Sequence, residues 1–180
     1  TRKTTRYRKL PNKLPVSLDP ENDIKELSEI LKLKSEPTHI EGFDISNISG
    51  TYTVASMVVF RNGKPSNGEY RRYKIRDVIA QDDFACMAEV VRRRYLRLKK
   101  EGRPLPDLIL IDGGKGQLSA KIKSLKKLRI FNKVPVISIA KRLEEIYFPN
   151  DKVPLYLDKR SETLKLVQRV RNEAHRFSIS

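Results

Sequence analysis

The sequence lacks features that would place it in several common classes of protein. It has a single cysteine among 180 residues, which excludes an internal disulfide and a cysteine-rich zinc site. No stretch comes near the roughly 20 apolar residues that a membrane-spanning helix needs. The first ten residues, TRKTTRYRKL, contain no apolar core of the kind found in secretory signals. Internal repeats and low-complexity tracts are also missing, so we expect a soluble intracellular protein of one domain's length.

Acidic residues are scarce relative to basic ones. The chain has 22 Asp and Glu against 38 Lys and Arg, which gives a formal net charge of +16. A field of this sign reaches about 8–10 Å at cellular ionic strength and attracts anions, most commonly nucleic acid. Residues 1–14 hold several basic residues and no acidic one, and Pro11 interrupts them. We interpret this segment as an extended basic lead-in, either a linker or an arm that contacts DNA.

The hydrophobic pattern of the first half predicts a helix followed by an antiparallel meander. Asp19-Pro20 precedes apolar residues at helical spacing, which predicts a short helix over residues 21–33. Runs rich in β-branched residues then predict strands, with the turn Asn62-Gly63 between the second and the third. These strands are residues 39–45, 53–60 and 70–76.

Helical and strand patterns alternate in the second half. An apolar stripe with a period near 3.6 predicts a helix from Asp82-Asp83 to Gly102, with Cys86 as a packing residue inside it. The remaining predicted elements are a buried strand at 108–111, a helix through 118–128, a buried strand at 134–140, a hairpin at 144–158 and a helix from 161 to about 177. A meander followed by right-handed βαβ units predicts an α/β fold, a ribonuclease H-like mixed sheet of antiparallel meander plus parallel strands, flanked by helices.

Asp44 is the first candidate for chemistry. It lies in a predicted strand between Phe43 and Ile45, so its side chain points to the face opposite theirs. A buried carboxylate is costly unless it is paired or binds a metal ion. The alternative is an aspartate at the edge of the sheet that accepts a hydrogen bond from a backbone amide.

Asp112 is the second candidate. It ends a buried parallel strand, where open α/β sheets place their active sites, and Gly113-Gly114 allow a sharp turn beside a ligand. The alternative is a turn aspartate, since Asp-Gly is also a turn signal. Because Asp44 and Asp112 come from adjacent central strands in the predicted topology, the two carboxylates are able to share a divalent cation.

His175 is the third candidate. Around the axis of the last predicted helix, His175 and Arg171 lie at nearly the same angle as Leu164. A line of polar side chains therefore runs beside the apolar side of this helix. This would bring an imidazole to the carboxyl edge of the sheet. The alternative is a surface histidine. His39, at the start of a strand, has no comparable polar neighbours.

These three residues together indicate phosphodiester hydrolysis. Oxygen ligands suit Mg²⁺ or Mn²⁺, and an added imidazole favours tolerance of Mn²⁺. Two carboxylates and a histidine in a basic protein are typical of two-metal hydrolysis, in which metal ions activate water and stabilise the leaving oxygen. The segment 113–117, GGKGQ, does not fit the nucleotide-binding Walker pattern, because Gly116 follows Lys115 where Ser or Thr is needed.

The motifs in this order resemble the C-terminal nuclease half of UvrC, the bacterial nucleotide excision repair nuclease. The resemblance spans roughly residues 38–179, with residues 1–37 as a basic linker and short helix that enter a domain over residues 38–180. The segments that carry it are Phe43-Asp44-Ile45-Ser46, residues 53–60, Tyr70-Arg71-Arg72-Tyr73, Asp82-Asp83-Phe84, Arg92-Arg93-Arg94-Tyr95, residues 108–118, Ala140-Lys141-Arg142 and residues 171–177.

The resemblance implies a metal-dependent endonuclease domain that cuts DNA on the 5′ side of a lesion, in the bacterial cytoplasm. It implies loading by UvrA and UvrB, and the family's Asp–Asp–His set falls on Asp44, Asp112 and His175, which would hold Mg²⁺ or Mn²⁺. Asp83 matches a further acidic position implicated in the family, with helix capping as its alternative role. The resemblance implies that the family's UvrB contact region and its helix-hairpin-helix DNA-binding module lie outside this chain. We expect a monomer.

Two positions depart from the family's pattern. Asn47 stands where the family usually has His, and Asn172 where it usually has Asp. Neither belongs to the triad, so we expect activity to survive, although the second departure removes a carboxylate that could orient His175. Two other functions stay open: a basic nucleic-acid-binding module with a degenerate site, and a ribonuclease that acts on RNA–DNA hybrids.

Overall fold

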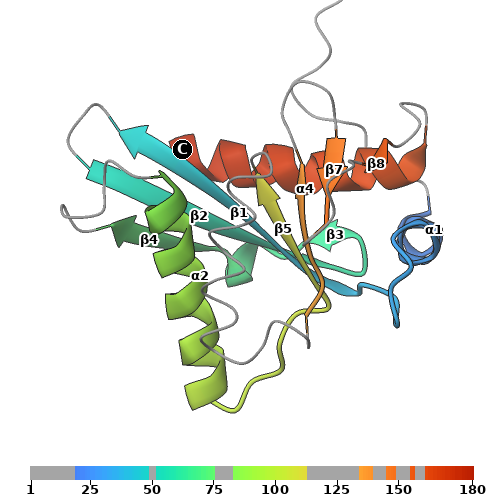
Figure 1. Cartoon of the computed structure of the whole chain (residues 1–180), viewed down its shortest axis with the longest axis horizontal. Coiled ribbons are helices and arrows are strands. Elements are labelled where there is room, and N and C mark those ends of the chain that lie inside the picture. The colour runs from blue at the N-terminus through green and yellow to red at the C-terminus, as the bar shows by residue number, and fades with distance from the viewer. Residues whose placement is uncertain are drawn as a thin grey trace, which may run out of the picture.

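The computed structural model describes residues 19–48, 52–75, 83–112, 134–139, 145–148, 155–156 and 161–180. Its elements are α1 (Pro20–Ile30), β1 (His39–Ile48), β2 (Tyr52–Arg61), β3 (Lys64–Pro65), a 3-10 turn (Asn67–Glu69), β4 (Arg71–Ile75), α2 (Asp83–Lys100), β5 (Leu108–Asp112), β6 (Val136–Ile139), β7 (Glu145–Tyr147), β8 (Leu155–Tyr156) and α4 (Glu162–Ile179), as drawn in Figure 1. The helix predicted through 118–128 and the segment 113–117 lie outside these ranges.

The strands form one mixed sheet in the order β3-β2-β1-β5-β6-β7-β8, with β4 also paired to β2. The strands β1, β2 and β4 are antiparallel, which confirms the predicted meander. The pairs β1–β5 and β5–β6 are parallel, and β6–β7–β8 continue antiparallel as the predicted hairpin. This is the predicted α/β fold, and the short strand β3 is an addition that the pattern did not predict.

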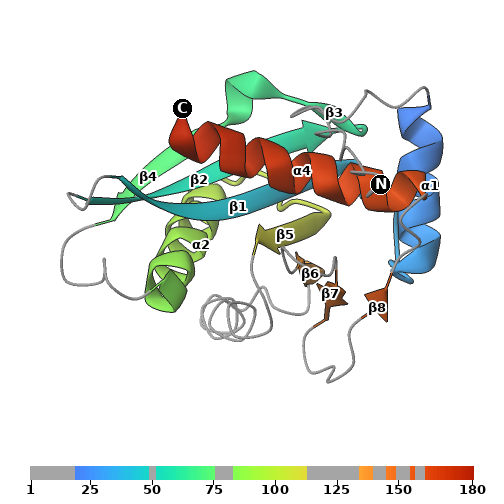
Figure 2. The ribbon, with the colours of Figure 1, turned by 90° about the horizontal axis from the view of Figure 1, so that it is seen from above.

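Helices cover both faces of the sheet (Figure 2). α2 packs on one face and α4 on the other, and α1 crosses the N-terminal end of α4. Alternation along β1 explains the two layers, because Phe43 joins the core under α2 while Ile40 joins the core under α4. Cys86 is buried in the α2 core, as predicted for a packing residue.

Local sequence signals set the ends of the helices. The side chain of Asp19 accepts a hydrogen bond from Asn22 N at the start of α1, and Ser161 does the same for Leu164 N in α4. Gly102, with a φ of +64°, follows the end of α2 in the left-handed conformation that glycine favours. In the ranges that the structure covers, no helix has the length and apolar character needed to cross a membrane.

α1 belongs to the same core as α4. Its residues Ile24 and Leu27 are buried against that helix, and its buried Asp23 lies 3.5 Å from the guanidinium of Arg169. The helix predicted in the N-terminal segment is thus confirmed and anchored on the sheet. The domain boundary at residue 37 stays a prediction.

Candidate active site

Two buried carboxylates lie at the carboxyl ends of neighbouring parallel strands. The last register pair that joins β1 to β5 is Phe43 with Ile111, and Asp44 and Asp112 are the next residues of the two strands. The two residues are 4% and 7% exposed. The sequence predicted this adjacency from strand order alone.

Both aspartates belong to the α4 side of the sheet. Gly42, two residues before Asp44, faces Val170 of α4, and side chains alternate along a strand. In β5, Leu108 and Leu110 pack in the core under α4, which places Asp112 on the same side. The α4 face at the ends of β1 and β5 is therefore where polar groups meet.

α4 brings His175 to this position. Its Nδ1 lies 3.1 Å from Oδ2 of Asp44, and the imidazole is half-exposed while the carboxylate is buried. The other oxygen of Asp44, Oδ1, accepts a hydrogen bond of 2.8 Å from the backbone amide of Ile45. Asp44 thus makes both the amide contact considered as an alternative and a contact with the predicted histidine.

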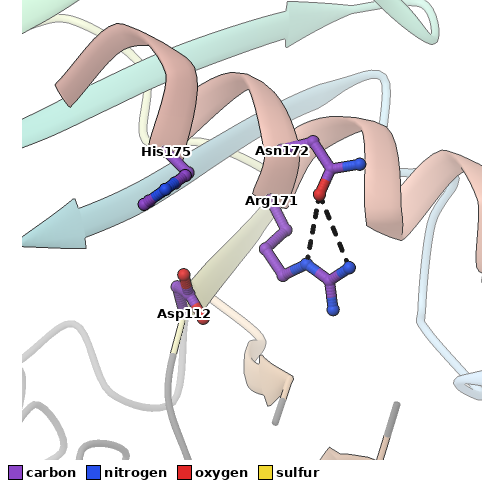
Figure 3. A pocket seen from close by; sticks show the side chains of 4 residues that line it. All are labelled: Asp112, Arg171, Asn172 and His175. Atoms are coloured by element: carbon purple, nitrogen blue, oxygen red, sulfur yellow. Dashed lines mark hydrogen bonds between the residues drawn. The ribbon is translucent and has the colours of Figure 1, made fainter. Parts of the chain in front are cut away.

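A pocket of about 210 Å³ opens beside these residues. It is lined by Asp112 from β5 and by Arg171, Asn172 and His175 from α4 (Figure 3). Two guanidinium nitrogens of Arg171 donate to Oδ1 of Asn172, each at 3.4 Å. The polar line predicted beside the apolar stripe of α4 therefore faces the end of β5, and Asn172 contacts Arg171.

Ser178 is a site residue that the sequence reasoning missed. It is buried on α4, and its hydroxyl lies 3.5 Å from Oδ2 of Asp44. The available signal was its spacing of three residues from His175, which puts both side chains on one face of a helix. The carboxylate of Asp44 is thus approached by two side chains of α4.

The structure places Asp83 at the first residue of α2, on the side of the sheet away from α4. Its side chain lies outside the described part of the structure. The predicted role of Asp83 in the site, with helix capping as its alternative, stays a prediction.

The donor chemistry at the strand ends fits a hard divalent cation. The carboxylates of Asp44 and Asp112 offer the oxygen ligands that Mg²⁺ and Mn²⁺ prefer, and His175 offers the imidazole that Mn²⁺ accepts. In this arrangement Nδ1 of His175 contacts Asp44. No group of three or more His, Cys, Asp or Glu with metal-binding geometry occurs among the residues that the structure describes.

A second polar cluster lies on the opposite face of β1, and it corrects the expectation for His39. The Nε2 of His39 lies 3.0 Å from Oε2 of Glu41, which is fully buried. Arg94 and Tyr95 of α2 donate to the same carboxylate, at 2.9 Å and 3.1 Å. Burial alone would raise the pKa of Glu41, but hydrogen bonds from His39 and Arg94, with their charges, lower it below the ordinary value of 4.5.

Comparison with known proteins gives a consistent result across the chain. A family model described as the UvrC RNase H endonuclease domain matches residues 28–179. The chain is 56% identical to the UvrABC system protein C of Christiangramia forsetii over 167 residues, which are 91% of this chain and 28% of that protein. It is 46% identical to the protein of the same name from Salinibacter ruber, over 99% of this chain and 28% of that one. The chain thus spans less than a third of the relatives that it matches.

Solved structures are more distant. Endonuclease V of Ciona intestinalis, in complex with DNA containing inosine, is 20% identical, with a TM-score of 0.45 over 73% of this chain and 60% of that one. Human ENDOV is 15% identical with a TM-score of 0.40, over 81% of this chain and 84% of that one. The assignment of this chain therefore depends on the family model and the sequence relatives.

Proposed function

Since the chain belongs to the UvrC RNase H endonuclease domain family, we propose that it is a divalent-metal-dependent endonuclease that hydrolyses a phosphodiester bond of DNA. Within a full-length protein it would make the incision on the 5′ side of a lesion, after loading by UvrA and UvrB. The observation that carries the proposal is the juxtaposition of Asp44 and Asp112 at the ends of adjacent parallel strands, with His175 in contact with Asp44.

The proposed chemistry assigns a task to each of these side chains. Asp44 and Asp112 would hold the metal ions, which supply an activated water and stabilise the leaving oxygen. An ionised carboxylate only accepts hydrogen bonds, so the contact of Asp44 with Nδ1 of His175 favours the tautomer in which Nδ1–H donates to Asp44 and the lone pair lies on Nε2. His175 is then oriented to take up or deliver a proton at Nε2.

Arg171 supplies positive charge in the pocket that Asp112 lines. It lines the pocket together with Asp112 and His175, and a guanidinium binds phosphate oxygens through directional hydrogen bonds. The net charge of +16 draws DNA toward a site whose own carboxylates would repel it. We propose that Arg171 binds a phosphate of the strand to be cut.

The test is a nicking assay on duplex DNA with Mg²⁺ or Mn²⁺, using Asp44→Asn and Asp112→Asn. Each substitution should reduce nicking at least about 100-fold, while the Kd for DNA changes little. Glu36→Gln, which removes an exposed acid that does not line the pocket, is the matched control and should nick normally. Retained nicking in both aspartate variants would overturn the proposal.

Two further measurements separate the alternatives. A binding module with a degenerate site would bind DNA and nick neither damaged nor undamaged duplex with either metal. A ribonuclease for hybrids would cut an RNA–DNA hybrid faster than a DNA duplex.

A separate experiment tests the side of the incision. In a full-length relative, the corresponding domain is replaced by this chain, and UvrA and UvrB are added. The cut is then mapped on a DNA that carries one defined lesion.

A further inference from the structure

Arg72 of β4 contacts the C-terminal end of α4, more than a hundred residues later in the sequence. Its guanidinium donates to the backbone carbonyl of Phe177 at 2.9 Å and to that of Ser180 at 3.0 Å, and it also contacts the Ser180 hydroxyl. The guanidinium carbon lies 4.1 Å from the centroid of the Phe177 ring. Figure 2 shows this end of α4 above the part of the sheet formed by β2 and β4.

These contacts satisfy groups that a helix cannot satisfy itself. The last four carbonyls of an α-helix have no intrahelical donor, and its C-terminal end carries a partial negative charge. One terminal nitrogen of the Arg72 guanidinium, Nη2, makes these contacts, and the group brings a positive charge to this end of the helix. Phe177 is fixed from a second side, because its ring packs edge-on against Tyr70 with 5.2 Å between the centroids.

The fixed turn is the one that reaches Asp44. His175 lies two residues before Phe177, and Ser178 is the residue directly after Phe177. Both contact Oδ2 of Asp44, at 3.1 Å and 3.5 Å. The last turn of α4 is thus held by Arg72 from β4 and presents two side chains to the carboxylate of β1.

We propose that Arg72 is a positioning residue that keeps the last turn of α4 in place, so that His175 stays on the carboxylate of Asp44. The effect on hydrolysis rests on the proposed function, whereas the effect on the imidazole does not. Without the Arg72 contacts, the last turn would fray. His175 would then lose its fixed tautomer, and Nε2 would no longer be held ready for a proton.

The neighbouring arginine is a matched control. Arg71 is also exposed on β4, but its contacts are with the nearby carbonyls of Gly68 and Tyr70, at 3.1 Å and 2.8 Å. Arg71→Ala and Arg72→Ala therefore remove the same side chain and charge from adjacent positions. Arg72→Lys keeps the charge and removes the planar fork.

The primary measurement is the nitrogen-15 NMR spectrum of the imidazole rings. The chain has two histidines, so the signals of His175 are read against those of His39, which is bound to buried Glu41 on the other face of the sheet. Arg72→Ala should shift the His175 signals toward those of an imidazole exchanging between tautomers, with His39 unchanged. Amide exchange in the last turn of α4 should rise about tenfold, and Arg71→Ala should leave both observables unchanged.

Kinetic measurements complete the test. Arg72→Ala should lower kcat about tenfold and change the Kd for DNA less than twofold, and Arg72→Lys should restore only part of the kcat. An increased Kd with unchanged His175 signals would show that Arg72 binds DNA instead, and would overturn the proposal.

If Arg72→Ala does not fold, the test depends on Arg72→Lys alone. Unchanged His175 signals and unchanged amide exchange in that variant would contradict the positioning role of Arg72. A shift of the His175 signals in a protein that never nicks DNA would support positioning and refute the proposed function.

Discussion

Gly42 of β1 lies directly against Val170 of α4. A Cβ atom on this glycine would be 2.6 Å from Cγ1 of Val170 and 3.3 Å from Cγ2 of Val58. The absence of a side chain at position 42 lets α4 approach β1 this closely. The same approach brings His175, five residues after Val170, onto Asp44, two residues after Gly42.

We therefore predict that Gly42→Ala lowers the free energy of unfolding by about 1–3 kcal/mol, the usual effect of overpacking a core. The added methyl group should displace α4 and weaken the contact between His175 and Asp44. The double variant Gly42→Ala/Val170→Ala should lose less stability than the sum of the two single variants, because the alanine at 170 makes room. Denaturant unfolding of all three proteins measures this coupling.

Gly68→Ala is the control for this series. A Cβ at position 68 would meet no atom within 4 Å, and the backbone there does not have a positive φ. Its unfolding free energy should stay within about 0.5 kcal/mol of the parent. Strictly additive effects of the substitutions at 42 and 170 would contradict the close-approach explanation.

Glu41 should make the protein sensitive to acid. Its pKa is depressed in the folded state, so its stabilisation is fully present above the ordinary value of 4.5 and is lost as the pH falls through the folded-state value. Glu41→Gln leaves the cation of Arg94 buried without its counter-charge. We expect a loss of about 3–5 kcal/mol at pH 7, and a weaker dependence of stability on pH below 4.5 than in the parent.

An ion pair at the surface provides the comparison. Arg61 and Glu69 are 2.7 Å apart but partly exposed, and the hydrogen bond from Arg61 lowers the pKa of Glu69 to about 2. Glu69→Gln should cost about 1 kcal/mol or less at pH 7. Equal losses for the two variants, measured by urea unfolding at pH 7, would show that the Glu41 cluster contributes no more than a surface pair.

The parts of this fold that were predictable depend on regular periodicity. Alternation in β1 and the buried run of β5 were enough to place Asp44 and Asp112 together, because the ends of parallel neighbours meet at one edge. Helical spacing placed His175 beside the apolar stripe of α4. These inferences need only the direction of each element and the order of the strands.

The contacts that were missed depend on partners far apart in the sequence. In the sequence, Glu41 is one polar residue within a predicted strand. The residues around it do not indicate that Arg94 and Tyr95 of α2 bind its carboxylate in the core. The hydroxyl of Ser178 and the guanidinium of Arg72 are ordinary surface-type groups until α4 is docked on the sheet. Such pairs follow from tertiary packing, which strand and helix periods do not encode.

Arg171 should contribute to DNA affinity through one phosphate. Arg171→Gln should weaken binding at low salt and reduce the slope of log K against log salt by about one, with little dependence on DNA sequence. Lys34→Gln removes an exposed charge from a residue that does not line the pocket and is the control. Fluorescence anisotropy from 50 to 200 mM salt measures both slopes, and equal slopes for the two variants would contradict a phosphate contact at Arg171.

Metal binding can be tested without turnover. An ion that binds the folded state alone stabilises it by about 2.7 kcal/mol at 100 times its Kd. We expect saturating Mn²⁺ to raise the Tm of the parent, and Asp44→Asn and Asp112→Asn each to abolish most of that increase, since each replaces one of the two negatively charged carboxylates at this edge of the sheet by a neutral amide. Glu36→Gln should retain the full increase, and EDTA should reverse it. Equal shifts in all four proteins would mean that Mn²⁺ binds elsewhere, whereas a loss confined to the two aspartate variants would locate the ion between the ends of β1 and β5.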